Sequence, residues 1–203
     1  DVFCFGPPDR EGNLPENLFH PSRVLRGVHA GVRVGGNESG IPTVNGAIVF
    51  DDRYIGKPLV YCGTVGIMPR TLTDGRPSHI KTPVAGDIVY MVGGRVGYDG
   101  IHGATFSSLG LTEESPSSAV QIGDPITQKK MLDMVLEARD AGLITCITDN
   151  GAGGLSSSIG EMAEYTNGCE IDLAKVPLKQ AGLSPWEILV SESQERMTIA
   201  VRP

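Results

Sequence analysis

One acidic residue stands where a strand-like segment meets a run of glycines. The segment ITDNGAGGLSSS places Asp149 at the end of the apolar stretch Leu143–Thr148, directly before a glycine-rich turn and a predicted helix. Free N–H groups at a helix N-terminus bind phosphate, and a carboxylate beside them binds a divalent cation. The pattern therefore indicates a metal–phosphate site. The alternative is that Asp149 only caps the helix and the glycines only make a tight turn.

A second set of polar residues, SESQER from Ser191 to Arg196, lies between a predicted helix, Pro185–Val190, and a predicted strand, Met197–Val201. Such a junction is usually a solvated turn. The apolar residues on both sides favour a position at the edge of the core, facing a cleft. Gln121 ends another short apolar stretch, and its side-chain amide can donate and accept hydrogen bonds, as a substrate with an amide group would require.

The loop GGRVGYDGIHGA contains five glycines from Gly93 to Gly103. Their spacing does not match the G-x-G-x-x-G dinucleotide motif, and no Gly-Lys-Ser/Thr follows, so the loop is not a P-loop. Both a mobile loop and a loop that contacts a ligand are consistent with this composition. Asp99 and His102 within it are candidates to titrate or to bind a ligand, although each also fits an ordinary surface position.

Other kinds of catalytic site find no support in the sequence. The chain has no G-x-S-x-G elbow, no H-E-x-x-H motif and no EF-hand loop, and its histidines show no metal-ligand spacing. No two cysteines lie within four residues of each other, which excludes a C-x-x-C pair. Cys62 and Cys146 lie in strand-like runs, where a free thiol behaves as a small hydrophobic residue. We therefore expect a reducing, cytoplasmic location.

The composition excludes several classes of partner. The chain has 203 residues, of which 40% are hydrophobic, so it can form one large domain or two small ones. A formal net charge of −7 argues against nucleic acid and anionic membranes as partners. Only 5% of the residues are aromatic, which weakens any case for base stacking. No apolar run reaches the roughly 18 residues that a membrane-spanning helix needs.

Periodicity divides the chain into two parts around the polar, proline-flanked stretch Pro69–Pro83. For the first part we predict a strand at Val2–Phe5 and a helix from Pro21 to the cluster Gly35-Gly36-Asn37. Two further strands, Thr43–Phe50 and Leu59–Met68, follow, joined by a hairpin or a longer loop.

Strands and helices alternate in the second part, which predicts an α/β or α+β domain with a sheet covered by helices. A helix capped by Asp124 should end at Gly142. The other predicted elements are strands at Ile88–Val92, Leu143–Thr148, Cys169–Leu173 and Met197–Val201 and helices at Gly154–Tyr165 and Pro185–Val190.

In this order, the motifs resemble one family. The matching text is GNESGIPTVNGAIVFDDRYIGKPLVYCGTVGIMPR, GDIVYMVGGRVGYDGIHGATFSS, VQIGDPITQKK, TDNGAGGLSSSIGEMA and PWEILVSESQERM. The chain is similar, colinearly and over essentially its whole length, to the synthetase component of phosphoribosylformylglycinamidine synthases, in the aminoimidazole-ribonucleotide-synthetase-like superfamily. SESQERM at this distance after D-x-G-A-x-G is the most specific part of the match. Val96 and Tyr98 stand where many members carry Thr and Arg.

The resemblance implies a cytoplasmic, ATP-dependent ligase of purine biosynthesis. ATP would activate the amide oxygen of formylglycinamide ribonucleotide through an iminophosphate, and ammonia would displace phosphate to give the amidine. A separate glutaminase subunit or domain would supply the ammonia. Magnesium would neutralise charge that develops during phosphoryl transfer.

Residue roles follow from the same resemblance. Asp149 is expected to bind magnesium, and His102 and Gly151 to contact ATP. Gln121, Glu192, Ser193 and Gln194 are expected to contact the ribonucleotide. Because Gln121 precedes Asp149 by 28 residues, a strand–helix–strand unit would bring both to one end of a sheet. Arg196 and Asp99 are further candidates.

The resemblance also predicts an incomplete enzyme. Residues 1–70 would be the C-terminal part of an N-terminal synthetase-like domain, 71–84 a linker and 85–203 a C-terminal synthetase-like domain. The histidine-rich catalytic motif and an additional magnesium carboxylate of the family would lie upstream, so the catalytic residues are unknown and the fragment alone should be inactive. Two alternatives stay open: a non-catalytic module that binds or assembles with a glutaminase, and another ATP-using member of the superfamily.

Overall fold

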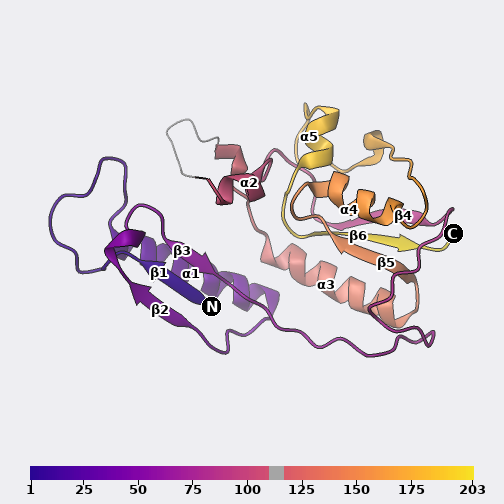
Figure 1. Cartoon of the computed structure of the whole chain (residues 1–203), viewed down its shortest axis with the longest axis horizontal. Helices are drawn as coiled ribbons and strands as arrows, with labels where there is room; N and C mark the ends of the chain where they lie inside the picture. The colour runs from indigo at the N-terminus through magenta and orange to yellow at the C-terminus, as the bar shows by residue number, and fades with distance from the viewer. Residues whose placement is uncertain (110–116) are drawn as a thin grey trace. The chain divides into compact units, whose positions relative to one another are not determined.

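The computed structural model describes residues 1–109 and 117–203, and the chain forms two compact units, Asp1–Ile67 and Met68–Pro203. Each unit builds its own three-stranded sheet, as Figure 1 shows. The chain therefore combines helices with a mixed and an antiparallel sheet, which confirms the predicted α/β (α+β) class.

The first unit consists of a sheet and one long helix. Its elements are β1 (Val2–Phe5), α1 (Pro21–Ser39), β2 (Ala47–Phe50), the 3-10 turn η1 (Asp52–Tyr54) and β3 (Leu59–Tyr61). β1 lies in the middle, parallel to β2 and antiparallel to β3. Phe3, Cys4 and Phe5 of this central strand are buried.

Two predictions for the first unit are wrong in detail. β2 and β3 are shorter than expected, because they pair with only four and three residues of β1 respectively; since both flank β1, the longer loop and not the hairpin connects them. α1 runs through Gly35 and Gly36 to Ser39, and its C-cap is Gly40, whose left-handed φ of 70° ends the helix. Neither α1 nor another helix of the described residues is long and apolar enough to cross a membrane.

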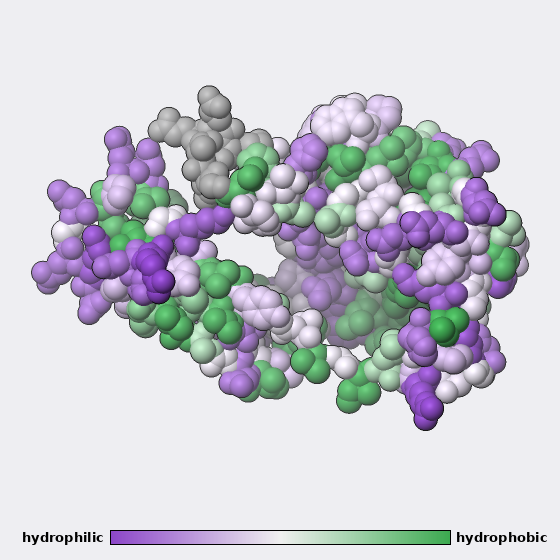
Figure 2. Space-filling model, viewed as in Figure 1, coloured by the Kyte–Doolittle hydropathy of each residue, from purple (hydrophilic) through white to green (hydrophobic). Residues whose placement is uncertain are grey.

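The sheet of the first unit leaves much apolar surface uncovered. Ile48, Phe50, Leu59 and Tyr61 are each about half exposed. Figure 2 shows hydrophobic residues in green at the surface of this unit. The side chains of β2 and β3 are therefore left largely exposed by this unit.

The second unit carries the remaining elements. They are β4 (Ile88–Gly93), α2 (Gly103–Ser107), η2 (Ser117–Ala119), α3 (Pro125–Asp140), β5 (Ile144–Asp149), α4 (Gly154–Ala163), η3 (Leu173–Lys175), α5 (Pro185–Val190) and β6 (Arg196–Val201). β6 lies between β4 and β5 and is antiparallel to both. Figure 1 shows α4 in orange beside this sheet.

The core of the second unit lies where α4 and α5 pack together. Val96 is fully buried among Leu155, Ile159, Leu183 and Ile188. Val96 occupies this apolar position instead of facing a ligand, which explains why an apolar residue suits a loop otherwise made of glycine and polar residues.

Most elements predicted for the second unit are confirmed, and one is wrong. The Asp124 side chain accepts a hydrogen bond from the Thr127 N–H, with Pro125 at the first helical position, so α3 begins as predicted. The predicted strand Cys169–Leu173 does not form. Instead, the Asp172 side chain accepts a hydrogen bond from the Ala174 N–H and starts the 3-10 turn η3, which bends the chain away from an extended conformation.

The polar, proline-flanked stretch Pro69–Pro83, which precedes β4, is hydrogen-bonded to the second unit. The Arg76 guanidinium donates hydrogen bonds to the carbonyls of Ile144 and Thr145, and the Thr82 N–H donates to the Thr145 carbonyl at 2.9 Å. These bonds occupy backbone groups of the edge strand β5. The segment thus covers a sheet edge that would otherwise be open to other chains.

Candidate functional site

The polar segment Ser191–Arg196 connects α5 to β6 and lies inside the second unit. Ser191, Glu192, Ser193 and Arg196 are at most 4% exposed. A solvated turn, one of the two interpretations of this junction, is therefore wrong. Buried polar groups need hydrogen-bond partners, and the partners of this segment define the candidate site.

Glu192 connects three other parts of the unit. Its Oε2 accepts hydrogen bonds from the Ala104 N–H at 2.8 Å and from the Gln121 side-chain amide at 3.3 Å. Its Oε1 accepts a hydrogen bond from the Gly153 N–H at 3.3 Å. The buried carboxylate thus joins α2, the segment before α3 and the turn after β5. Gln121 and the Asp149 turn thus meet at Glu192, but Gln121 follows the short turn η2 and does not end a strand, so the predicted strand–helix–strand unit does not form.

The glycines of the 93–103 loop allow this segment to approach closely. A Cβ at Gly100 would lie 2.8 Å from the Glu192 carbonyl carbon, and one at Gly103 would lie 3.0 Å from the Glu192 carboxylate. A Cβ at Gly93 would collide with the Glu195 carbonyl oxygen. The loop needs glycine because the 191–196 backbone packs against it, and this packing accounts for its composition without a bound ligand.

Asp149 ends β5 and has an exposed carboxylate, in contrast to Glu192. Its Oδ1 accepts a hydrogen bond from the Gly151 N–H at 2.8 Å, while no donor among the described residues reaches Oδ2. The backbone beside it pairs with the polar segment, since the Asn150 N–H donates to the Arg196 carbonyl. The two stretches that the sequence singled out therefore lie side by side.

Asn150 is a buried polar residue that sequence reasoning missed. Its Oδ1 accepts hydrogen bonds from the hydroxyls of Ser158, at 2.7 Å, and Thr198, at 3.1 Å. These bonds tie the turn to α4 and β6. The Asn150 amide nitrogen has no partner among the described residues. The only sequence signal for Asn150 is its position directly after Asp149.

Ser193, Gln194 and Arg196 of this segment also have hydrogen-bond partners within the second unit. The Ser193 hydroxyl donates to Asp99 Oδ1 at 2.9 Å, and the half-buried Gln194 amide donates to the Glu192 carbonyl at 3.2 Å. The Arg196 guanidinium donates to the carbonyls of Ser191 and Ser193. Burial lowers the Arg196 pKa to about 10, because the charged form loses solvation. Arg196 therefore stabilises the turn by binding two of its carbonyl groups.

The two residues expected to contact ATP differ in their surroundings. Gly151 donates its N–H to Asp149, and a Cβ at Gly151 would lie 2.6 Å from Asp149 Oδ1. His102 is exposed, has a left-handed φ of 60° and stacks on Trp186, with 6.4 Å between ring centroids. Trp186 was not predicted, and the sequence holds no local signal for it.

The residues present fit a magnesium ion. Within residues 1–109 and 117–203, no group of three or more His, Cys, Asp or Glu side chains gathers in a metal-binding arrangement. Magnesium, however, is commonly held by one or two carboxylates together with waters and substrate phosphates. The exposed Asp149 carboxylate, with Oδ2 unengaged, matches that kind of ligand.

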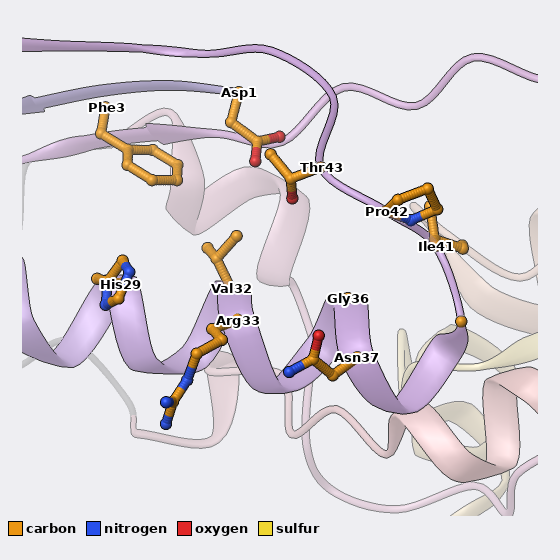
Figure 3. Close-up of a pocket in the computed structure, with 11 residues that line it drawn as sticks. Asp1, Phe3, His29, Val32, Arg33, Gly36, Asn37, Ile41, Pro42 and Thr43 are labelled. Atoms are coloured by element: carbon orange, nitrogen blue, oxygen red, sulfur yellow. The ribbon is translucent and has the colours of Figure 1, made fainter.

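Two cavities of the structure lie away from these residues. One, of about 640 Å³, lies within the first unit between α1 and the start of β1; in Figure 3, Val32 points across it toward Asp1 and Thr43. The other, of about 860 Å³, lies beside β4 and α4 in the second unit. Neither is lined by Asp149 or Glu192. The candidate site is thus separate from both of these cavities.

Comparison with known proteins identifies related chains. The family model "AIR synthase related protein, C-terminal domain" matches residues 84–203. A phosphoribosylformylglycinamidine synthase subunit PurL from Thermoplasma acidophilum is 44% identical over all of this chain and 28% of its own length. The corresponding subunit from Methanopyrus kandleri is 42% identical over all of this chain and 27% of its own length. The chain thus spans little more than a quarter of the curated relatives it matches.

Solved structures give the same result. A Thermotoga maritima PurL structure described as complexed with FGAR matches all of this chain and 31% of that chain, with a TM-score of 0.72 and 29% identity. Another, described as complexed with ATP, matches 90% of this chain and 28% of that chain, with a TM-score of 0.66 and 31% identity. The similarity extends over both units.

Proposed function

The chain belongs to the AIR synthase related protein family, and from this premise we propose that it is part of a cytoplasmic, ATP-dependent phosphoribosylformylglycinamidine synthase. In this proposal the ligase converts formylglycinamide ribonucleotide (FGAR) and glutamine-derived ammonia to the formylglycinamidine ribonucleotide. Residues 1–70 belong to one synthetase-like domain, 85–203 to the next, and 71–84 link them. A glutaminase subunit or domain supplies the ammonia.

The observation that supports the proposal most is the contact between the Asp149 turn and the buried segment Ser191–Arg196. Glu192 accepts a hydrogen bond from Gly153, and Asn150 donates one to Arg196. An exposed carboxylate beside a helix N-terminus is thereby fixed next to amide- and hydroxyl-bearing residues. Phosphoryl transfer to an amide oxygen requires these two kinds of group near one another.

We assign the roles as follows. Asp149 holds a magnesium ion, which neutralises phosphate charge when it is bound. His102 and Gly151 lie beside the nucleotide. Gln121, Glu192, Ser193 and Gln194 form the wall for the ribonucleotide (the substrate wall).

The chemistry of the reaction explains why an amide needs ATP. An amide carbonyl is a poor electrophile, and transfer of the γ-phosphoryl group to its oxygen creates a leaving group. Ammonia then attacks the carbon and forms the C–N bond, its nitrogen loses a proton, and the C–O bond breaks as phosphate departs, which leaves the amidine. The complete enzyme must position the two reactants and keep water away, because water would attack the same activated carbon.

Substrate binding tests the proposal directly. Titration calorimetry of the full-length protein with FGAR should give saturable binding, and FGAR together with ammonia should stimulate ADP release. Gln194→Ala should weaken FGAR binding about tenfold, which corresponds to about 1.4 kcal/mol. Gln128→Ala removes a similarly half-buried amide from α3 and should leave FGAR affinity unchanged. Absence of FGAR binding to the full-length protein would refute the proposal, while FGAR binding without ADP release would favour the non-catalytic module.

A further inference from the structure

A second buried carboxylate, Asp99, contacts the substrate wall at Ser193 and has no assigned role. Its side chain is 9% exposed. Lys179 Nζ lies 2.9 Å from its Oδ1 and 2.8 Å from its Oδ2, forming an ion pair between residues 80 positions apart. The Lys179 side chain is 35% exposed, so solvent reaches the lysine more readily than the carboxylate.

The backbone brings Lys179 to this position. The Val96 N–H donates to the Pro177 carbonyl at 3.0 Å, and the Lys179 N–H donates to the Val96 carbonyl at 2.8 Å. Gly97 leaves room for the pair, since a Cβ there would collide with the Asp99 carboxylate and lie 2.7 Å from Lys179 Cδ. Two main-chain hydrogen bonds, together with the space that glycine leaves at position 97, therefore fix the ion pair in place.

Asp99 determines the orientation of the Ser193 hydroxyl. The Ser191 hydroxyl donates to the Gly97 carbonyl at 2.7 Å, and the Gly97 N–H donates to Ser193 Oγ at 3.0 Å. The single Ser193 hydroxyl proton then has two acceptors on Asp99, the carbonyl oxygen at 3.2 Å and Oδ1 at 2.9 Å, and the nearer, charged Oδ1 is favoured. Ser193 is 1% exposed, so its rotamer depends on these partners.

We propose that Asp99, held by Lys179, is a positioning residue for the substrate wall and sets its affinity for FGAR without touching the substrate. The inference rests on the proposed function, because it assumes that Glu192–Gln194 contact FGAR. Ser193 lies between Glu192 and Gln194 in the chain, so a shift of Ser193 displaces both of these wall residues.

The charge state of Asp99 agrees with this role. Burial alone would raise the Asp99 pKa, but the hydrogen bonds from Lys179 and Ser193 outweigh burial and lower the pKa below its ordinary value. Asp99 is therefore ionised at neutral pH, as an acceptor for the Ser193 hydroxyl requires.

The test measures steady-state kinetics with FGAR in the full-length enzyme, together with thermal unfolding. Lys179→Met and Asp99→Ala should each raise the KM for FGAR about tenfold and leave kcat within about twofold. Lys179→Arg keeps the ion pair and should restore the wild-type KM. Because Lys179 is partly exposed, its variants should fold and give a KM for FGAR even if Asp99→Ala fails to fold.

Asp87→Ala is the matched control. Asp87 is another buried carboxylate of the second unit, and it pairs with Arg202 and accepts a hydrogen bond from Thr145 at 2.9 Å, away from the wall. Asp87→Ala should lower the melting temperature and leave the KM for FGAR unchanged. Equal KM values for Lys179→Met and wild type, or an equal rise in Asp87→Ala, would overturn the inference. If the wild-type full-length enzyme showed no FGAR-dependent turnover, the proposed function itself would be overturned instead.

Discussion

Asp149 and Glu192 are carboxylates on two stretches of backbone that lie side by side, yet their surroundings are opposite. Asp149 is exposed and accepts one hydrogen bond, from Gly151. Glu192 is 4% exposed and accepts three, from Ala104, Gln121 and Gly153. A carboxylate has about four lone-pair sites, so Glu192 has nearly exhausted its capacity while Asp149 retains most of it.

This difference in burial indicates different tasks for the two carboxylates, which the sequence pattern alone could not assign. A saturated, buried carboxylate can take a new partner only by giving up a present one, which costs about 1–3 kcal/mol for each buried donor left unpaired. An exposed carboxylate can bind a cation without disturbing the fold. Stability should therefore depend on Glu192 and its neighbours, and metal-dependent activity on Asp149.

The largest effect should come where the two stretches touch. Gly154 has a left-handed φ of 55°, and a Cβ there would collide with the Ser191 carbonyl oxygen. Gly154→Ala combines this collision with backbone strain and should lower the free energy of unfolding by about 3 kcal/mol. Gly160→Ala, on the same helix with open space around it, is the control and should not destabilise. Urea titration measures both, and similar midpoints for the two variants would contradict the close packing.

Asp149→Asn should separate activity from stability. The substitution keeps the shape and the hydrogen bond from Gly151 but removes the charge that a magnesium ion requires, so FGAR-dependent ADP release should fall about 100-fold, or about 2.7 kcal/mol. The melting temperature should stay within about 1 °C of wild type, because the side chain is exposed. Raising the magnesium concentration should partly restore the rate. A large fall in melting temperature would mean that Asp149 only supports the turn.

The sequence predicted local structure well where local interactions decide it. α3 begins at its Asp124 cap and Pro125, and α5 covers the predicted residues. The predicted strand at Cys169–Leu173 failed because the side-chain turn at Asp172 overrides β propensity. Strand lengths in the first unit failed for another reason, since pairing partners, and not the apolar pattern, determine where β2 and β3 end.

For the candidate site, the sequence identified the two chemically rich stretches, and the structure places them side by side. Single-sequence reasoning could not assign Asp99, because its partner Lys179 lies 80 positions away in a loop with no motif of its own. Nor could it distinguish the buried Glu192 from the exposed Asp149. Burial depends on contacts that sequence spacing does not encode.

Glu192→Gln should have a smaller effect than Gly154→Ala but should affect stability, unlike Asp149→Asn. The amide nitrogen must face at least one of the three N–H donors, which leaves a buried donor unpaired and costs about 2 kcal/mol. For a unit of this size the melting temperature should fall by roughly 6 °C. Glu187→Gln would be a poor comparison because Glu187 forms a capping box, so the exposed Glu137→Gln on α3 serves as the control. No difference between these variants would show that Glu192 is not saturated.

The smallest effect should come from Glu195, whose exposure is intermediate between that of the buried Glu192 and that of the exposed Asp149. Burial raises the pKa of this carboxyl, opposed by a hydrogen bond from the Asp124 backbone. A folded-state pKa above the unfolded value of about 4.3 means that the charged form destabilises the fold at neutral pH. Glu195→Gln should therefore be slightly more stable than wild type at pH 7, by less than about 1 kcal/mol. The difference should disappear below about pH 3, where the carboxyl is protonated in both states, and a difference independent of pH would contradict the burial of this charge.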